Sequence, residues 1–224
     1  FIDVGQGFGD YVPDLNGANG KVYKWLAPVN GLKQGRYEPA IFLVTPKKQQ
    51  VLSAGINYKI TPGTVVNTEV ATSIYDQNTF SSKGQENQQG YAAKLQISNT
   101  QRVGSAARGK TLTSDVGLEF VEARFRPIER IRNVEYTRDW GLPLVVTPED
   151  ETIITAGLQL NDTKNNSVRY QFTNYYRSNV FKGLRNSIIQ SQDIKGWKFN
   201  NTVHLSNITT TTEKGYFFRP NTAV

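Results

Sequence analysis

The side chains that could carry acid–base or nucleophilic chemistry are few and scattered. His204 is the only histidine, and the chain has no cysteine and no methionine. A nucleophile–histidine–acid site needs specific partners around the imidazole, and the sequence indicates none for His204. The acidic run at 149–151 follows Pro148, which is typical of a solvated turn rather than of a paired acid and base. The sequence therefore predicts that the protein is not an enzyme.

The same counts exclude a disulfide scaffold, a thiolate metal site and any site that needs two imidazoles. Near the N-terminus, Asp10, Asp14, Asn16 and Asn19 resemble the oxygen ligands of a calcium loop. Counting from Asp14, however, the twelfth position holds Trp25 instead of the required carboxylate. Asx turns and glycine turns explain this cluster more simply. We expect no cofactor and no metal, with calcium near Asp10, Asp14 and Asn16 left open as the alternative.

The densest run of charges lies between residues 124 and 140, where basic and acidic side chains alternate. One interpretation is a cationic constriction or a loop that docks a partner. The favoured interpretation is that Arg–Glu and Arg–Asp pairs hold a long connection rigid through bidentate hydrogen bonds. The candidate residues are Arg124, Arg126, Glu129, Arg130, Arg132, Glu135, Arg138 and Asp139.

The charge balance is basic but carries little specific information. The chain has 26 basic and 19 acidic residues in 224, a net charge of +7. The basic residues are spread along the sequence, and Lys47–Lys48 is the only adjacent pair. Nucleic acid, which binds to clustered basic residues, is therefore not expected as a partner.

The hydrophobic pattern has a period of two almost everywhere after residue 49, which is the period of a β-strand. In the segment 51–60, for example, Leu52, Ile56 and Ile60 share a face, and Lys59 lies on the other. We predict an all-β fold, an antiparallel up-and-down meander of about seven to eight strands over residues 49–224. Residues 1–48, rich in glycine and proline, are expected to be an irregular loop or plug-like segment. The segment 184–193 is expected to hold at most a turn of helix.

The predicted connections alternate between short and long, as in bacterial outer-membrane barrels, whose turns are short at one end and whose loops are long at the other. The alternating segments also reach the ~9–11 residues that a membrane-spanning strand needs. Such a barrel turns its polar face toward a wet lumen and its apolar face toward lipid. An interfacial aromatic girdle is expected from Tyr75, Phe80, Phe125, Tyr175, Tyr176 and Phe181. A soluble β-sandwich, in which strands also alternate, remains the alternative.

Five stretches together resemble a known group of proteins. They are VGQGFGDYV (4–12), GRYEP (35–39), LVTPKKQQ (43–50), YDQNTFS (75–81) and FRPIER (125–130). The group comprises large, uncharacterised outer-membrane or cell-surface β-barrel proteins of Bacteroidota-type bacteria. The resemblance implies an outer-membrane setting and a much longer parent chain, and it implies no catalytic residues.

The sequence therefore favours a structural or transport component of the bacterial outer membrane or cell surface. The meander is expected to be a fragment of a larger barrel with a polar interior that acts as a pore, a conduit or an assembly subunit. Its expected partners are outer-membrane lipid and either the rest of the same barrel or other outer-membrane subunits. The alternative is a soluble all-β surface module that binds glycan or a protein partner. The total strand number, the cargo, and the role of residues 1–48 as loop, plug or cap stay open.

Overall fold

The chain divides into two compact units, Phe1–Thr45 and Pro46–Val224. The computed structural model describes residues 1–16, 20–40, 44–83, 85–104, 109–142, 147–164 and 166–223. Asn19 and Leu43, which belong to the calcium-loop alternative and to the resemblance above, lie outside this part of the chain. Within the described residues, no helix is both long and apolar enough to cross a membrane.

The first unit contains a small antiparallel sheet, so residues 1–48 are more regular than the expected irregular loop, and a plug-like role for them stays a prediction. Its strand order is β1-β4-β2-β3. The strands are β1 (Ile2–Asp3), β2 (Tyr11–Asp14), β3 (Val22–Trp25) and β4 (Tyr37–Glu38). Their brevity explains why alternation did not reveal them, because two to four residues are too few to define a period.

Close backbone packing and aromatic contacts hold this small sheet together. Gly9 and Gly35 form an antiparallel bridge, and a Cβ atom at Gly9 would lie 2.5 Å from the backbone of Tyr37. Only glycine permits such an approach. The ring of Phe1 stacks on Tyr23 with centroids 4.2 Å apart, and Tyr23 lies 5.1 Å from Tyr37.

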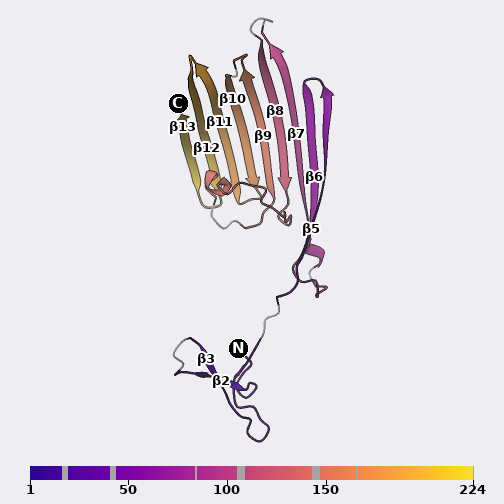
Figure 1. Ribbon diagram of the computed structural model, residues 1–224, viewed down its shortest axis with the longest axis vertical. Coiled ribbons are helices and arrows are strands. Elements are labelled where there is room, and N and C mark those ends of the chain that lie inside the picture. Colours follow the sequence, from indigo (N-terminus) through magenta and orange to yellow (C-terminus); the bar gives the residue numbers. More distant parts are fainter. Residues whose placement is uncertain are drawn as a thin grey trace. The chain divides into compact units, whose positions relative to one another are not determined.

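The second unit is a nine-stranded antiparallel sheet in which every strand pairs with its neighbours in sequence (Figure 1). The predicted up-and-down meander is confirmed. The strands are β5 (Lys48–Thr61), β6 (Thr64–Asp76), β7 (Gln89–Val103), β8 (Lys110–Val121), β9 (Glu151–Asn161), β10 (Ser167–Arg177), β11 (Phe181–Ile194), β12 (Trp197–Thr210) and β13 (Lys214–Ala223). Two short helices lie in the connections, η1 (Gln85–Asn87) and α1 (Tyr136–Asp139).

The count of seven to eight strands is too low because β11 was not recognised. The segment 184–193, expected to hold at most a turn of helix, lies within this strand and pairs along its length with β10 and β12. Leu184 and Ile188 are four residues apart, a spacing that places two side chains on one face of a helix and equally on one face of a strand. The pattern alone therefore could not separate the two structures.

The ladder register gives the sheet two chemically different faces. In the described strands, the one register shift falls between Lys59 and Thr61 of β5, so alternate residues of every strand lie on the same face. The apolar face carries Leu52, Ile56, Val70, Leu95, Leu118, Ile154, Leu158, Ile188 and Leu205, and the polar face carries Lys59, Glu69, Lys94, Asp115, Glu119, Arg169, Arg185 and His204. The large apolar side chains remain exposed, with Leu52 at 72% and Ile56 at 69%.

The connections differ between the two ends of the sheet. At one end, β5 and β6 are joined through residues 62–63 and β11 and β12 through 195–196. At the other end, β6 and β7 are joined through 77–88 and β8 and β9 through 122–150. This end also carries short links at 178–180 and 211–213. The first of these is short because the residues that follow it form strand β11.

The first unit makes a pH-dependent contact that can be measured directly. The pKa of Asp3 lies below its usual 3.8 because its carboxylate accepts a hydrogen bond from the backbone N–H of Gly5 and pairs with Arg36 at 2.8 Å. This contact stabilises the fold above pH 3.8 and is lost as the pH falls through the lowered pKa. We expect Arg36→Gln to raise the Asp3 pKa toward 3.8 without reaching it, since the Gly5 bond remains. An unchanged value in a carboxyl NMR titration would contradict the contact.

Candidate functional site

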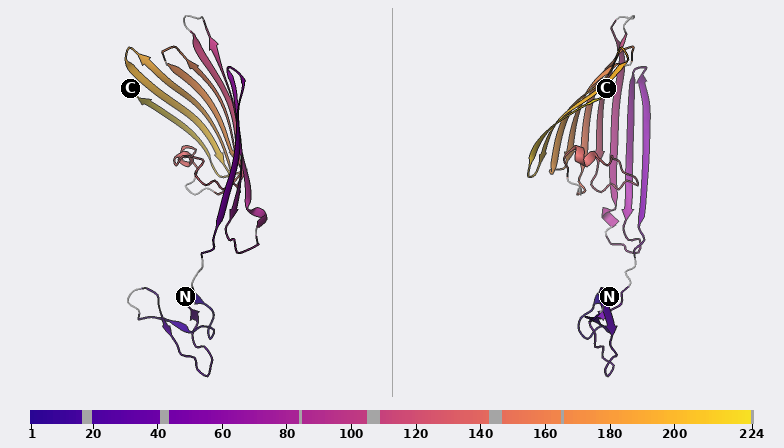
Figure 2. Two further views of the ribbon diagram at one scale, coloured as in Figure 1. Left: turned by 45° about the vertical axis from the view of Figure 1, so that its right-hand side comes forward. Right: turned by 60° about the vertical axis from the view of Figure 1, so that its left-hand side comes forward.

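The connection 122–150 folds back onto the polar face of the sheet and makes the most elaborate site in the second unit. Figure 2 shows the curvature of the sheet and the segment with α1 lying against one of its faces. The attachment has three parts, an ion-pair network near residue 132, a hydrogen bond from Arg126 to Ser73 and an aromatic cluster around Trp140.

Arg132 is the centre of the ion-pair network. Its guanidinium pairs with Glu119 of β8 and lies 3.7 Å from Glu151 of β9. Arg177 of β10 donates from Nε to Glu151 at 3.0 Å and from Nη2 to the carbonyl of Thr147 at 2.6 Å. Arg132 and Glu119 are each only 22% exposed, so solvent screens this pair less than a surface pair. The network therefore joins three strands to the connection at two points, Arg132 and Thr147.

A second anchor lies nearer to the start of the connection. The backbone N–H of Arg126 donates to Ser73 Oγ at 2.8 Å, and the Ser73 side chain is fully buried. Phe125, 7% exposed, packs beside this bond. A Cβ atom at Gly90 would overlap the backbone of Phe125, so this position of β7 needs a residue without a side chain.

Trp140 is the centre of the aromatic cluster. Its ring is 2% exposed and lies 5.4 Å from Tyr175 and 6.3 Å from Phe181 in edge-to-face geometry. Ile153 and Ile208 complete the buried group. Offset and edge-to-face aromatic pairs stabilise packing beyond the area that they bury. Burial also raises the pKa of Tyr136, whose ring lies 5.5 Å from Tyr175.

Two arginines fix the end of α1 to the sheet. Arg185 donates to the carbonyl of Asp139, and its guanidinium lies 4.0 Å from the centroid of a Trp140 ring. Arg219 Nη1 lies 3.3 Å from the Asp139 carboxylate and Nη2 donates to the carbonyl of Arg138 at 3.4 Å. Both guanidinium groups thus bind backbone carbonyls at the end of α1, and the Arg138 carbonyl also accepts a hydrogen bond from the N–H of Gly141 at 3.1 Å.

His204 lines a pocket of about 420 Å³ beside these arginines. Its Nδ1 lies 2.7 Å from Ser187 Oγ, directly opposite in the β11–β12 register. Sequence reasoning missed this serine because its partner is in another strand. Ser187 is buried, and within the described residues no carboxylate hydrogen-bonds to the imidazole. The arrangement fits a cross-strand polar pair rather than a nucleophile and its base.

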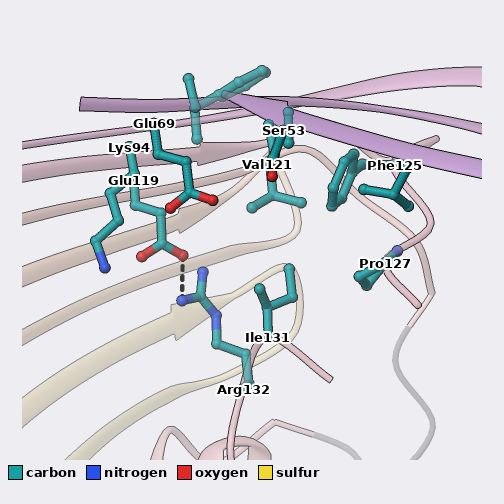
Figure 3. A pocket seen from close by; sticks show the side chains of 14 residues that line it. Ser53, Glu69, Lys94, Glu119, Val121, Phe125, Pro127, Ile131 and Arg132 are labelled. Atoms are coloured by element: carbon teal, nitrogen blue, oxygen red, sulfur yellow. Dashed lines mark ion pairs between the residues drawn. The ribbon is translucent and has the colours of Figure 1, made fainter. Parts of the chain in front are cut away.

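A smaller pocket of about 290 Å³ lies between the strands and the connection (Figure 3). Glu69, Lys94, Glu119 and Arg132 line it together with apolar side chains that include Phe125. Figure 3 shows the Glu119–Arg132 pair at one side of this pocket and Glu69 close by. Acidic and basic side chains line the same pocket. This is typical of a hydrated polar surface rather than of a binding site for a single ion.

Two glycines on the polar face lie where side chains of other segments pass over a strand. Arg169 of β10 pairs with Asp115 of β8 at 2.8 Å across the intervening strand β9. A Cβ atom at Gly157 of β9 would overlap both side chains of this pair. At Gly183 of β11 a Cβ atom would lie 2.7 Å from the ring of Trp140. An isolated glycine within an alternating segment is the signal that could have located these contacts from sequence.

The eight charged residues singled out in 124–140 fall into three groups. Arg132 and Asp139 bind to the sheet, and Arg126 attaches through its backbone, whereas its Nη1 donates to the carbonyl of Ala123. Arg124 pairs locally with Glu122, and Arg138 with Glu135. Glu129 and Arg130 are exposed and have no ion pair within the described residues. A few of these charges thus attach the connection to the sheet, whereas the rigidity of the connection and the docking of a partner by the other charges stay predictions.

The structure places five of the six residues of the expected aromatic girdle off the apolar face of the sheet. Tyr175 and Phe181 lie buried on the polar face beneath the connection, and Phe125 is a buried residue of the connection itself. Tyr75 also falls on the polar face, because it is in register with Gln49. Phe80 is 85% exposed in the β6–β7 connection. Only Tyr176 lies on the apolar face of a strand.

No metal site is evident in the described part of the chain, which contains no group of three or more His, Cys, Asp and Glu side chains placed to hold an ion. Asp10 pairs with Lys33 at 3.0 Å, and Asp14 accepts a hydrogen bond from the backbone N–H of Asn16 at 3.0 Å. These contacts are those of an ion pair and an Asx turn.

Comparison with protein-family models, with curated proteins and with solved structures gave no significant match. The geometry of the sheet and its connection is therefore the basis for any functional conclusion.

The Arg132 network can be tested against a neighbouring arginine. Arg132→Gln leaves Glu119 without its cation and leaves Glu151 with Arg177 alone. A hydrogen bond to a charged group contributes about 1.5–3 kcal/mol. We expect proteolysis within 122–150 to accelerate, as measured by limited digestion with chymotrypsin. Arg130→Gln is the matched control, since Arg130 is exposed, and should leave the rate unchanged. Equal rates in both variants would contradict the anchoring role.

The fit of Trp140 over β11 predicts that Gly183→Ala destabilises the second unit. The added methyl group forces the Trp140 ring outward, and overpacking of this kind costs typically ~1–3 kcal/mol. In a Trp25→Phe/Trp197→Phe background, the emission of Trp140 should shift to the red and the free energy of unfolding in urea should fall. Gly109→Ala is the control, because a Cβ atom there meets nothing within 4 Å.

Proposed function

We propose that the meander of residues 46–224 forms part of the wall of an outer-membrane β-barrel with a polar interior. The protein then acts as a structural or transport component of the bacterial outer membrane, as a pore, a conduit or an assembly subunit. Its apolar face contacts lipid, and its polar face lines the interior.

The observation that carries this proposal is the distribution of charge on the apolar face. Within the described strands, the Lys, Arg, Asp and Glu side chains on this face belong to the first, second or last residue of a strand. They are Lys48, Asp76, Lys110, Lys182 and Lys214. The middle of every strand is free of charge on this face, whereas Glu69, Lys94 and Asp115 lie in mid-strand on the other. A charge at the bilayer midplane is costly and one near the interface is tolerated, so this arrangement suits hydrocarbon contact.

Burial supports the same conclusion. A soluble sandwich seals its apolar face beneath a second layer and leaves the polar face to water. Here the polar face is the one that the connection 122–150 covers, and Val116, Leu158 and Leu205 of the apolar face are each more than half exposed. Large exposed apolar side chains on strand after strand of one face are unusual for a soluble monomer.

Strand length and aromatic placement fit a bilayer. The strands of the meander are 10–15 residues long, against the ~9–11 that span the hydrocarbon core. On the apolar face, Tyr91 and Tyr216 lie near the end with the long connections, and Tyr58 and Trp197 near the end with the tight turns. Aromatic residues favour both membrane interfaces. These residues form a better candidate girdle than the set expected from sequence.

The proposal predicts that an arginine substitution is harmful on the apolar face of β7 and β8 and tolerated at the next residue of β7, on the polar face. Leu95 and Leu118 are direct cross-strand partners on the apolar face. Leu95→Arg and Leu118→Arg should each destabilise the protein in lipid bilayers by ~2–4 kcal/mol. Gln96→Arg, one residue along on the polar face, should be tolerated. The free energy of unfolding in vesicles is the measurement.

Two results would overturn the membrane assignment. One is equal tolerance of arginine at positions 95, 96 and 118. The other is a purified chain that is monodisperse in buffer without detergent, which would favour the alternative of a soluble surface module that binds glycan or a protein partner.

A further inference from the structure

The two edges of the nine-stranded sheet present long, unpaired strands. The outer edge of β5, Lys48–Thr61, and the outer edge of β13, Lys214–Ala223, have no strand partner within the described residues. Soluble proteins usually guard such edges with short strands, prolines or inward charges. β5 has 14 residues and no proline, and Leu52, Ala54, Ile56 and Tyr58 follow one another along its apolar face without a charge. This edge has the features of a strand that pairs with another.

The number of strands decides which pairing is possible. Each of the eight successive pairings from β5 to β13 is antiparallel, so the chain direction reverses eight times. As a result β5 and β13 run in the same direction. If the sheet closed on itself, these two edges would have to pair in parallel. Bacterial outer-membrane barrels are built from even numbers of antiparallel strands. A barrel that contains these nine strands therefore needs one further strand, or a larger odd number of further strands, in order to close.

The other available occupants do not fit. A second copy in the same membrane orientation would bring its β5 beside β13 and would again pair parallel. The strands of the first unit are two to four residues long, too short to span a bilayer beside β5. Pro220 lacks an N–H group, which weakens pairing near one end of β13 but leaves 214–219 able to form a ladder.

We propose that β5 and β13 each pair with an antiparallel strand supplied by another polypeptide segment, and that the number of added strands is odd. This inference rests on the proposed membrane function. The partner is a β-strand segment of about 9–11 residues or more with alternating polar and apolar side chains, running opposite to both edges. Backbone hydrogen bonds provide the binding, and the alternation fixes which face meets lipid.

Photo-crosslinking reads the direction of the partner strand. A benzophenone side chain is placed at Leu52 or at Tyr58 of β5, and at Tyr216 or at Thr222 of β13, in the parent protein in its native outer membrane. The crosslinked peptides are then sequenced by mass spectrometry. For each edge, the probe nearer the strand's N-terminus should reach a residue nearer the C-terminus of the partner strand. The control is the same probe at Leu158, which should reach β8 and β10.

A disulfide test measures self-closure, and the chain has no native cysteine to interfere. Ala54 and Val70 are direct partners between β5 and β6, at a Cα separation that a disulfide can bridge. The Ala54→Cys/Val70→Cys variant should oxidise fully in the membrane. Ile56→Cys combined with Tyr216→Cys, Phe218→Cys or Pro220→Cys, which sample different heights along β13, should form no intrachain disulfide.

The outcomes separate this inference from the function on which it rests. Three results would overturn the odd-strand pairing while the protein remains in the membrane. They are an intrachain disulfide between β5 and β13, a crosslinked partner peptide that runs parallel to the edge strand, and the absence of crosslinks from both edges when the Leu158 probe does crosslink. A protein that is soluble without detergent would overturn the membrane function itself.

Discussion

The unbroken register of the nine-stranded ladder is the constraint on which the rest of the second unit depends. A strand has a side-chain period of two, so a slip of one residue exchanges its faces. Over eight pairings the register shifts only beside Thr61, near the first turn. Because of this, charges that are dispersed through the sequence collect on one surface, and the opposite surface keeps its charges at the strand ends. Both the site on the polar face and the proposed lipid contact follow from that single regularity.

The polar face is not uniformly polar, and its exceptions have a common cause. Ile153, Tyr175, Phe181 and Ile208 occupy positions where the alternation calls for polar groups. Each packs beneath Trp140 or beside it, so these apolar side chains mark the area that the connection 122–150 covers. The network around Arg132 serves the adjoining area, where charged side chains of three strands face the connection. The connection is thus attached by burial at one point and by ion pairs at another.

The sequence predicted the fold class and most of the meander because the alternation is strong in β5–β9 and in β12. It failed at β11, where Leu184 and Ile188 suit a helix and a strand equally, and in the first unit, whose strands are too short to show a period. For the site, charge density correctly drew attention to 124–140, but the sequence could not distinguish Arg132 from Arg130. Which arginine meets the half-buried Glu119 depends on the three-dimensional path of a 29-residue connection, and local patterns contain no information on that path.

The girdle expectation failed for a related physical reason. Tyr175 and Tyr176 are adjacent, and on a strand adjacent side chains point to opposite faces. Composition near a strand end cannot tell which of the two meets the interface, whereas the register assigns Tyr175 to the core beneath Trp140 and Tyr176 to the apolar face.

The strand register also makes the glycines of the polar face informative. Gly90, Gly157 and Gly183 interrupt alternation on the polar face, and each lies where a backbone, an ion pair or a ring crosses the strand. A missing side chain in a regular strand therefore locates tertiary contacts that the residues present do not reveal.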